Sequence, residues 1–199
     1  MIFTFFSSSI FAQSNSFTGK ILYEYSFQKP DTKEDITDRL APELGYEQHY
    51  FINSKNYKAY DENGNFVQSY NSETNKYYFL DPLTDQIMVI NGSIKTSQNV
   101  KVTYLDDIEV IMGKKCKKLI VKTERQETIY YYSEEIRVNP EPFLNHHFGD
   151  WSYYMEASNG ALPLKYVVEN EQYTWISTAK EIEEMKLSYK DFDPDIIFE

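Results

Sequence analysis

The chain has 199 residues, a formal net charge of −11 and a single cysteine. The acidic balance argues against a general nucleic-acid binder, because affinity for a duplex depends on neutralising phosphates with Lys and Arg. One cysteine cannot form an internal disulfide, so an apolar core must hold the fold. Aromatic residues make up 17% of the chain, with 18 Tyr and 13 Phe, and such side chains favour half-buried strands.

Residues 1–12 form an apolar stretch that ends in small residues, and Ala12 precedes Gln13. This pattern is typical of the core and cleavage region of a secretory signal peptide. No Lys or Arg precedes the stretch, which indicates a shortened start; the alternative is a buried first strand. A membrane span needs about 20 apolar residues. We therefore expect residues 13–199 to form a single β domain that does not span a membrane and is periplasmic or secreted in a Gram-negative bacterium.

An alternating pattern of apolar and polar residues runs from Phe17 to Gln28. It predicts a strand with one buried and one solvated face, as antiparallel sheets permit. The polar segment 29–45 contains Pro30, Pro42 and several charges. We expect a long loop there, with at most a helical turn.

Short candidate strands then follow at regular spacing, separated by turn signals such as Asn63-Gly64. They cover 47–53, 57–61, 66–70, 76–80, 86–90, 100–105, 108–112, 117–123 and 128–132. Strand patterning stops at 139–150, where we expect a short helix that ends at Gly149. Strands are expected again at 151–156, 162–169 and 172–179, while 180–187 fits either a strand or a helix. This arrangement predicts an all-β meander.

His146 and His147 are the first candidates for chemistry, since imidazole is the commonest metal ligand. Adjacent residues on a helix point about 100° apart, and no His-x-x-x-His or Cys-x-x-Cys spacing occurs. The sequence therefore predicts no metal site and no cofactor. Cys116 lies among four lysines, which would favour a reactive thiolate, but strand alternation favours a small buried core residue.

Motifs of catalysis are absent from the sequence. There is no Gly-x-Ser-x-Gly elbow, and the neighbouring carboxylates Asp106 and Asp107 would face opposite sides of a strand. We therefore predict a protein that is not an enzyme. A hydrolase stays open as an alternative if His146 or His147 lies within hydrogen-bond reach of a Ser, a Cys or paired carboxylates in a cleft.

Aromatic residues are the remaining signal, since they occupy both faces of several predicted strands. One face must pack a core, and the other either meets another layer or lines an apolar cavity. Filled core and ligand cavity remain equally open on this pattern. The residues that we predict to line a cavity are Tyr23, Tyr25, Phe79, Trp151, Tyr153 and Trp175.

Four segments carry a resemblance to known families: 17–25 after the signal, 113–119 around Cys116, 129–136, and 160–165. They are similar to segments of the GLPGLI-type and related uncharacterised periplasmic families. Those families in turn resemble the lipoprotein-carrier (LolA/LolB-like) superfamily. The chain departs from the GLPGLI pattern at Gly160-Ala161-Leu162-Pro163-Leu164.

The resemblance implies a mainly β fold with a strongly curved antiparallel sheet, an incomplete barrel, and one or two short helical segments against its concave side. In the carriers that concavity holds acyl chains. The leading hypothesis is a carrier-like protein that binds a lipid, an acyl chain or a lipoprotein partner. The alternative is an envelope structural or protein-interaction module with a filled core, and a cavity in the structure would favour the carrier.

Overall fold

The computed structural model describes residues 16–81 and 84–194, so the predicted signal peptide at 1–12 lies outside the described residues. The described chain forms one antiparallel sheet of eleven strands. Its strands are β1 (Gly19–Gln28), β2 (Glu47–Ile52), β3 (Asn56–Tyr60), β4 (Phe66–Asn71), β5 (Lys76–Asp81), β6 (Gln86–Asn91), β7 (Lys101–Ile111), β8 (Lys114–Lys122), β9 (Glu127–Arg137), β10 (Ala161–Glu169) and β11 (Thr174–Glu184).

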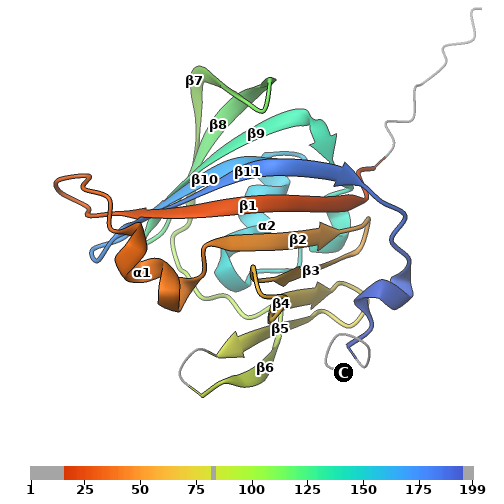
Figure 1. Ribbon diagram of the computed structural model, residues 1–199. Helices are drawn as coiled ribbons and strands as arrows, with labels where there is room; N and C mark the ends of the chain where they lie inside the picture. Colours follow the sequence, from red (N-terminus) through yellow and green to blue (C-terminus); the bar gives the residue numbers. More distant parts are fainter. Residues whose placement is uncertain (1–15, 82–83, 195–199) are drawn as a thin grey trace, which may run out of the picture.

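The sheet consists of two meanders that are joined at its centre. The strand order is β6-β5-β4-β3-β2-β1-β11-β10-β9-β8-β7, and β1 pairs with β11 from Gly19 opposite Glu184 to Gln28 opposite Thr174. The two edge strands, β6 and β7, are far apart, and the curved sheet is open (Figure 1). The prediction of a mainly β, strongly curved antiparallel sheet is therefore confirmed.

Three predicted boundaries differ from the structure. The strands expected at 100–105 and 108–112 are one strand, β7, with an irregular register between Leu105 and Glu109. The ambiguous segment 180–187 continues β11 as far as Glu184. The loop expected at 29–45 contains α1 (Thr37–Leu44), which buries Ala41 and packs beside β1.

The strand expected at 151–156 is wrong, because this segment is the helix α2 (Trp151–Ala157). The short helix expected before it is instead two 3-10 turns, η1 (Glu141–Phe143) and η2 (Phe148–Asp150). Trp151, Tyr154 and Met155 have the i, i+3, i+4 spacing of one helix face, and Tyr154 and Met155 are fully buried. Burial of that face against the sheet outweighs the strand preference of the aromatic residues.

The helical segment lies on the concave side of the sheet, where β1, β11 and β10 curve around α2 (Figure 1). The connection from β6 to β7 runs from one sheet edge to the other and contacts this segment. The backbone N–H of His147 donates to the carbonyl of Gly92 at 2.7 Å, and the hydroxyl of Ser97 donates to Asp150 at 2.8 Å. After β11 the chain makes a last 3-10 turn, η3 (Tyr189–Phe192).

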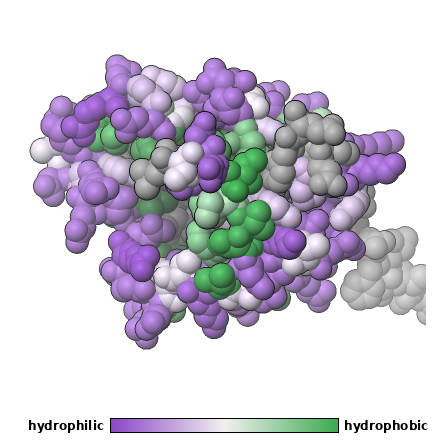
Figure 2. Space-filling view, turned by 90° about the horizontal axis from the view of Figure 1, so that it is seen from below, coloured by the Kyte–Doolittle hydropathy of each residue, from purple (hydrophilic) through white to green (hydrophobic). Residues whose placement is uncertain are grey.

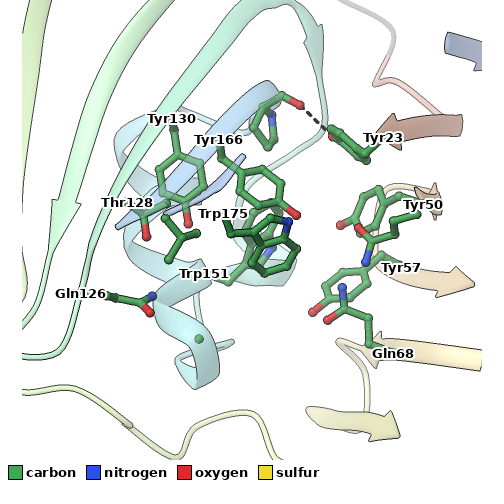
Figure 3. A pocket seen from close by; sticks show the side chains of 14 residues that line it. Tyr23, Tyr50, Tyr57, Gln68, Gln126, Thr128, Tyr130, Trp151, Tyr166 and Trp175 are labelled. Carbon is green, nitrogen blue, oxygen red and sulfur yellow. Dashed lines mark hydrogen bonds between the residues drawn. The ribbon is translucent and has the colours of Figure 1, made fainter. Parts of the chain in front are cut away.

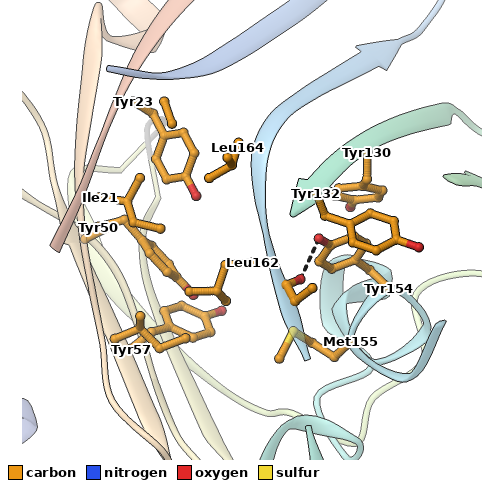
Figure 4. Close-up of a cluster of buried hydrophobic side chains, with 14 of the residues drawn as sticks. Ile21, Tyr23, Tyr50, Tyr57, Tyr130, Tyr132, Tyr154, Met155, Leu162 and Leu164 are labelled. Carbon is orange, nitrogen blue, oxygen red and sulfur yellow. Dashed lines mark hydrogen bonds between the residues drawn. The ribbon is translucent and has the colours of Figure 1, made fainter. Parts of the chain in front are cut away.

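The core lies between this concave face and α2 (Figure 4). Ile21, Met155, Leu162 and Leu164 are fully buried in it. The hydroxyl of Tyr154 donates to the carbonyl of Ala161 at 2.7 Å and so ties α2 to β10. Cys116 is also fully buried, and burial raises the pKa of its thiol, which confirms the prediction of a core residue.

The edge strand β6 carries apolar side chains that reach the surface. Ile87, Met88 and Val89 are 39%, 42% and 49% exposed, and Ile94, just after the strand, is 50% exposed. Seen from below, apolar residues gather on the face that includes this edge (Figure 2). No helix among residues 16–81 and 84–194 is long and apolar enough to cross a membrane.

Candidate functional site

A pocket of about 210 Å³ lies between the concave face of the sheet and the start of α2 (Figure 3). Strands from both meanders supply its lining, together with η2 and α2. The lining residues are Tyr23, Gln48, Tyr50, Tyr57, Gln68, Gln126, Thr128, Tyr130, Gly149, Trp151, Pro163, Tyr166, Val168 and Trp175.

Seven aromatic rings form a closed circuit of contacts at this pocket, each in contact with the next, and all of them except Tyr154 line it. Centroid distances between neighbours range from 4.1 Å, between Tyr130 and Tyr154, to 6.3 Å, between Tyr23 and Tyr50. We call this circuit the aromatic wall; its members in order are Tyr23, Tyr50, Tyr57, Trp151, Tyr154, Tyr130 and Tyr166. Aromatic pairs of this kind add packing energy beyond their buried area, so contacts within the wall stabilise the lining of the pocket.

Strand register brings these side chains together. Gln48 and Tyr50 are two residues apart on β2 and share one face, and Gln48 lies directly opposite Tyr23 on β1. On the other side of the pocket, Tyr166 of β10 lies opposite Tyr130 of β9. Figure 3 shows Tyr23, Tyr50 and Tyr57 across the pocket from Tyr130.

The pocket carries no formal charge. Among the described residues that line it there is no Asp, Glu, Lys, Arg or His. Desolvation raises the pKa of Tyr23, Tyr50 and Tyr57 well above the ordinary phenol value, and burial likewise raises the pKa of Tyr130 and Tyr166. These phenols therefore stay protonated and neutral at neutral pH.

Some polar groups of the lining have partners within the protein, and others have none. The hydroxyl of Tyr23 donates to the carbonyl of Pro163 at 2.7 Å. The hydroxyl of Tyr50 and the indole N–H groups of Trp151 and Trp175 are buried without a hydrogen-bond partner among the described residues. A buried polar group without a partner is costly. These three atoms have almost no exposed surface, so they do not face the open space of the pocket.

His146 is a buried structural side chain that contacts the lining residue Tyr57. It is 1% exposed, stacks on Tyr70 with ring centroids 4.2 Å apart, and shares a hydrogen bond of 2.6 Å with the hydroxyl of Tyr57 through Nε2. Desolvation lowers the pKa of His146 to about 3. In residues 16–81 and 84–194, no group of three or more His, Cys, Asp or Glu side chains is placed to hold a metal ion.

His147 lies within hydrogen-bond reach of a serine, which is one part of the condition for the hydrolase alternative; the other part is a position in a cleft. Its Nδ1 lies 2.8 Å from the hydroxyl oxygen of Ser152. Ser152 is 4% exposed, and neither residue lines the pocket. The carboxylate of Asp150, the nearest acid in sequence, bonds to Ser97. The pair therefore fastens the first turn of α2 to η2, and it lacks the access that a nucleophile needs.

The structure separates the six predicted cavity residues into two groups. Tyr23, Trp151 and Trp175 line the pocket. Tyr25 packs edge-on against Trp175 at 4.9 Å, Phe79 stacks on Phe148 at 5.8 Å, and Tyr153 lies beside the ring of His147 at 6.0 Å. These last three do not line the pocket.

The sequence did not predict the amide and hydroxyl side chains of the lining. Gln48, Gln68, Gln126 and Thr128 give the pocket amide and hydroxyl groups where an apolar interior was expected. The signal for Gln48 was present in the sequence, because it shares the parity of Tyr50 and Ile52 on an alternating strand. A polar residue at a buried position of an otherwise apolar face points to a binding site.

No model of a known protein family matches the chain, and no curated protein matches it. Among solved structures, PNGF-II superposes with a TM-score of 0.52 at 16% identity, over 92% of this chain and 30% of PNGF-II. The chain thus spans about 30% of the length of that protein, and the likeness shows the fold alone.

LolA superfamily proteins are also among the structural neighbours. One from Nitrosomonas europaea aligns with a TM-score of 0.38 at 10% identity, over 92% of each chain. A putative outer membrane lipoprotein-sorting protein domain from Vibrio parahaemolyticus aligns with a TM-score of 0.36 at 7% identity, over 90% of this chain and 91% of that one. The GLPGLI resemblance stays a prediction.

Proposed function

We propose that this chain is a non-enzymatic binding protein of carrier-like fold that holds a small ligand in the pocket inside the aromatic wall. The observation that carries the proposal is a pocket of about 210 Å³ that is lined by six rings of the aromatic wall. Ligand sites are typically concave and aromatic, with a few placed polar groups. The apolar stretch at 1–12 supports export, so we place the protein in the periplasm or outside the cell as a single β domain.

A ligand can be apolar or part of a lipidated partner, as the sequence suggested, or it can be polar. The test begins with the full chain and a panel of lauric acid, a lipopeptide and neutral methyl glycosides. Both tryptophans of the sequence line the pocket, so a saturable change in tryptophan fluorescence reports on this site.

A matched pair of variants separates the pocket from the rest of the surface. Val168→Phe enlarges a lining residue and should abolish the saturable signal, because added volume in a pocket of this size displaces the ligand. Val110→Phe makes the same change on β7, where the side chain is 66% exposed, and should leave binding intact. Absence of saturable binding across the whole panel would contradict the proposed function.

A second candidate function, an envelope interaction module, is favoured by the exposed apolar edge strand β6. An uncovered apolar edge can pair with a strand of another protein. Val89→Lys would block such pairing, and the matched change Val110→Lys on β7 serves as its control. Cross-linking in intact cells should give a product that Val89→Lys removes and Val110→Lys retains; equal products would exclude β6 as the contact.

A further inference from the structure

We propose that the pocket binds an uncharged, hydroxylated ring, which is the chemistry of a neutral sugar residue, and not an acyl chain. This inference rests on the proposed function, since it names the ligand class for the same pocket. Charge, hydrogen bonding and size each support it.

Charge comes first. The described lining residues bear no formal charge, and their polar groups are neutral phenols, indoles, amides and a hydroxyl. A charged ligand group placed here would lose its hydration and find no opposite charge in return, which is strongly unfavourable. The fatty-acid carboxylate and the sugar acids are therefore disfavoured inside the pocket, and a neutral group is favoured.

Hydrogen bonding is the second argument. The hydroxyl of Tyr50 and the indole N–H groups of Trp151 and Trp175 have no partner among the described residues, and Tyr50 is only 6% exposed. These three atoms have almost no exposed surface, so the hydrogen-bonding groups that a ligand meets are those of the polar lining residues. A ligand with several hydroxyl or carbonyl oxygens matches such groups, and a site that hydrogen-bonds its ligand rejects an analogue without those oxygens.

The amide side chains extend the same argument around the pocket. Gln48, Gln68 and Gln126 each carry both a carbonyl and an N–H₂ group, and Thr128 adds a hydroxyl. Groups that donate and accept suit ligand hydroxyls, which also do both. Figure 3 shows Gln68 on the side of Tyr57 and Gln126 with Thr128 on the opposite side, so polar groups face the ligand space from two directions.

Size and shape are the third argument. A pocket of about 210 Å³ is smaller than the roughly 300–1,000 Å³ of sites for drug-sized ligands. It suits a single ring. Aromatic walls offer broad flat faces, against which the C–H face of a saturated ring can pack while its hydroxyl groups point to the amides at the edges.

The experiment titrates the full chain with three classes of probe and follows tryptophan fluorescence, with isothermal calorimetry for the variants. The first class is a set of neutral methyl glycosides of glucose, galactose, mannose and N-acetylglucosamine. The second is glucuronic acid, which adds one carboxylate to the same ring. The third is lauric acid. We expect saturable binding of at least one neutral glycoside, and binding of glucuronic acid and lauric acid at least tenfold weaker.

Conservative variants then test the hydrogen-bonding argument. Gln48→Leu and Gln68→Leu keep a side chain of similar size but delete the amide, and each should weaken glycoside binding about tenfold. Gln172→Leu is the matched control, because Gln172 is exposed and lies outside the pocket. Gln126→Leu, close to a turn before β9, is a further variant should the core substitutions fail to fold.

The outcomes are distinguishable. Binding of lauric acid without any glycoside would overturn this inference and leave the proposed binding function standing. Glycoside binding that is unchanged in Gln48→Leu, Gln68→Leu and Gln126→Leu would also overturn it, because the sugar would then bind elsewhere. Absence of saturable binding by any probe would overturn the inference and the proposed function together.

Discussion

Mild acid should destabilise this protein through one buried side chain, His146. Its pKa is about 3 in the folded chain, against an ordinary value of 6.5, because the ring is desolvated among Tyr57, Tyr70 and Tyr77. The unfolded chain therefore takes up a proton on His146 as the pH falls through 6.5, while the folded chain does not. The stability is fully present above pH 6.5 and is lost progressively down to about pH 3.

The size of the stability loss follows from the gap between the pH and 6.5, the ordinary pKa of a histidine. One pKa unit corresponds to about 1.4 kcal/mol, so lowering the pH from 8 to 5 should reduce the free energy of unfolding by about 2 kcal/mol. For a chain of this size that loss lowers Tm by roughly 4–8 °C. Carboxylates with lowered pKa, such as Asp107 and Glu134, lose their contribution only near pH 4 and below, outside this window.

The assay is urea denaturation at half-unit pH steps between 5 and 8, repeated on two variants. His146→Phe keeps a ring against Tyr70 and removes the titrating group, so its free energy of unfolding should lose the slope between pH 5 and 6.5. His49→Gln, at a half-buried position beside Glu47, should keep the slope. A flat profile in the parent protein, or a slope that survives in His146→Phe, would refute the reasoning.

Three further predictions concern the stability of the fold and the reactivity of its buried thiol. Gly160→Ala should lower the free energy of unfolding by about 3 kcal/mol, because φ is +76° and the new methyl group would collide with the carbonyl of Val138. Gly64→Ala, with φ of +81° and open space around the glycine, should lower it by about 1 kcal/mol. Equal losses in urea denaturation would contradict this. Tyr154→Phe should lose about 1 kcal/mol, since the buried carbonyl of Ala161 loses its donor, and an unchanged urea midpoint would argue against that bond. Cys116 should react with Ellman's reagent only at the rate of unfolding, because the thiol is fully buried with a raised pKa; immediate labelling of folded protein would show otherwise.

Most strands were predictable from the sequence because their faces differ so clearly. On β1, Ile21, Tyr23, Tyr25 and Phe27 are buried while their neighbours are not, and this alternation is a property of the local sequence alone. The helix α2 was not predictable in the same way. Its seven residues include three aromatic ones, which favour strands, and two helical turns give little periodicity to set against that preference.

The pocket was harder to predict than the fold because it depends on pairing between distant strands. Tyr23 and Trp175 were chosen as aromatic residues on alternating strands, and both line it. Tyr153 is predicted together with Trp151 as an alternating position of a strand at 151–156, but this segment is a helix, and residues two apart on a helix do not face each other. Alternation along β2 places Gln48 on the same face as Tyr50, but its position opposite Tyr23 depends on the register between β2 and β1, which no local pattern reveals.

The pairing of β1 with β11 at the middle of the sheet also has a consequence for the order of folding. Each meander is made of neighbouring strands and can form early, but they join only after the segment 174–184 has been synthesised. Contacts between such distant parts of a chain form slowly. A nascent chain of this topology therefore lacks its complete sheet until β11 has paired with β1.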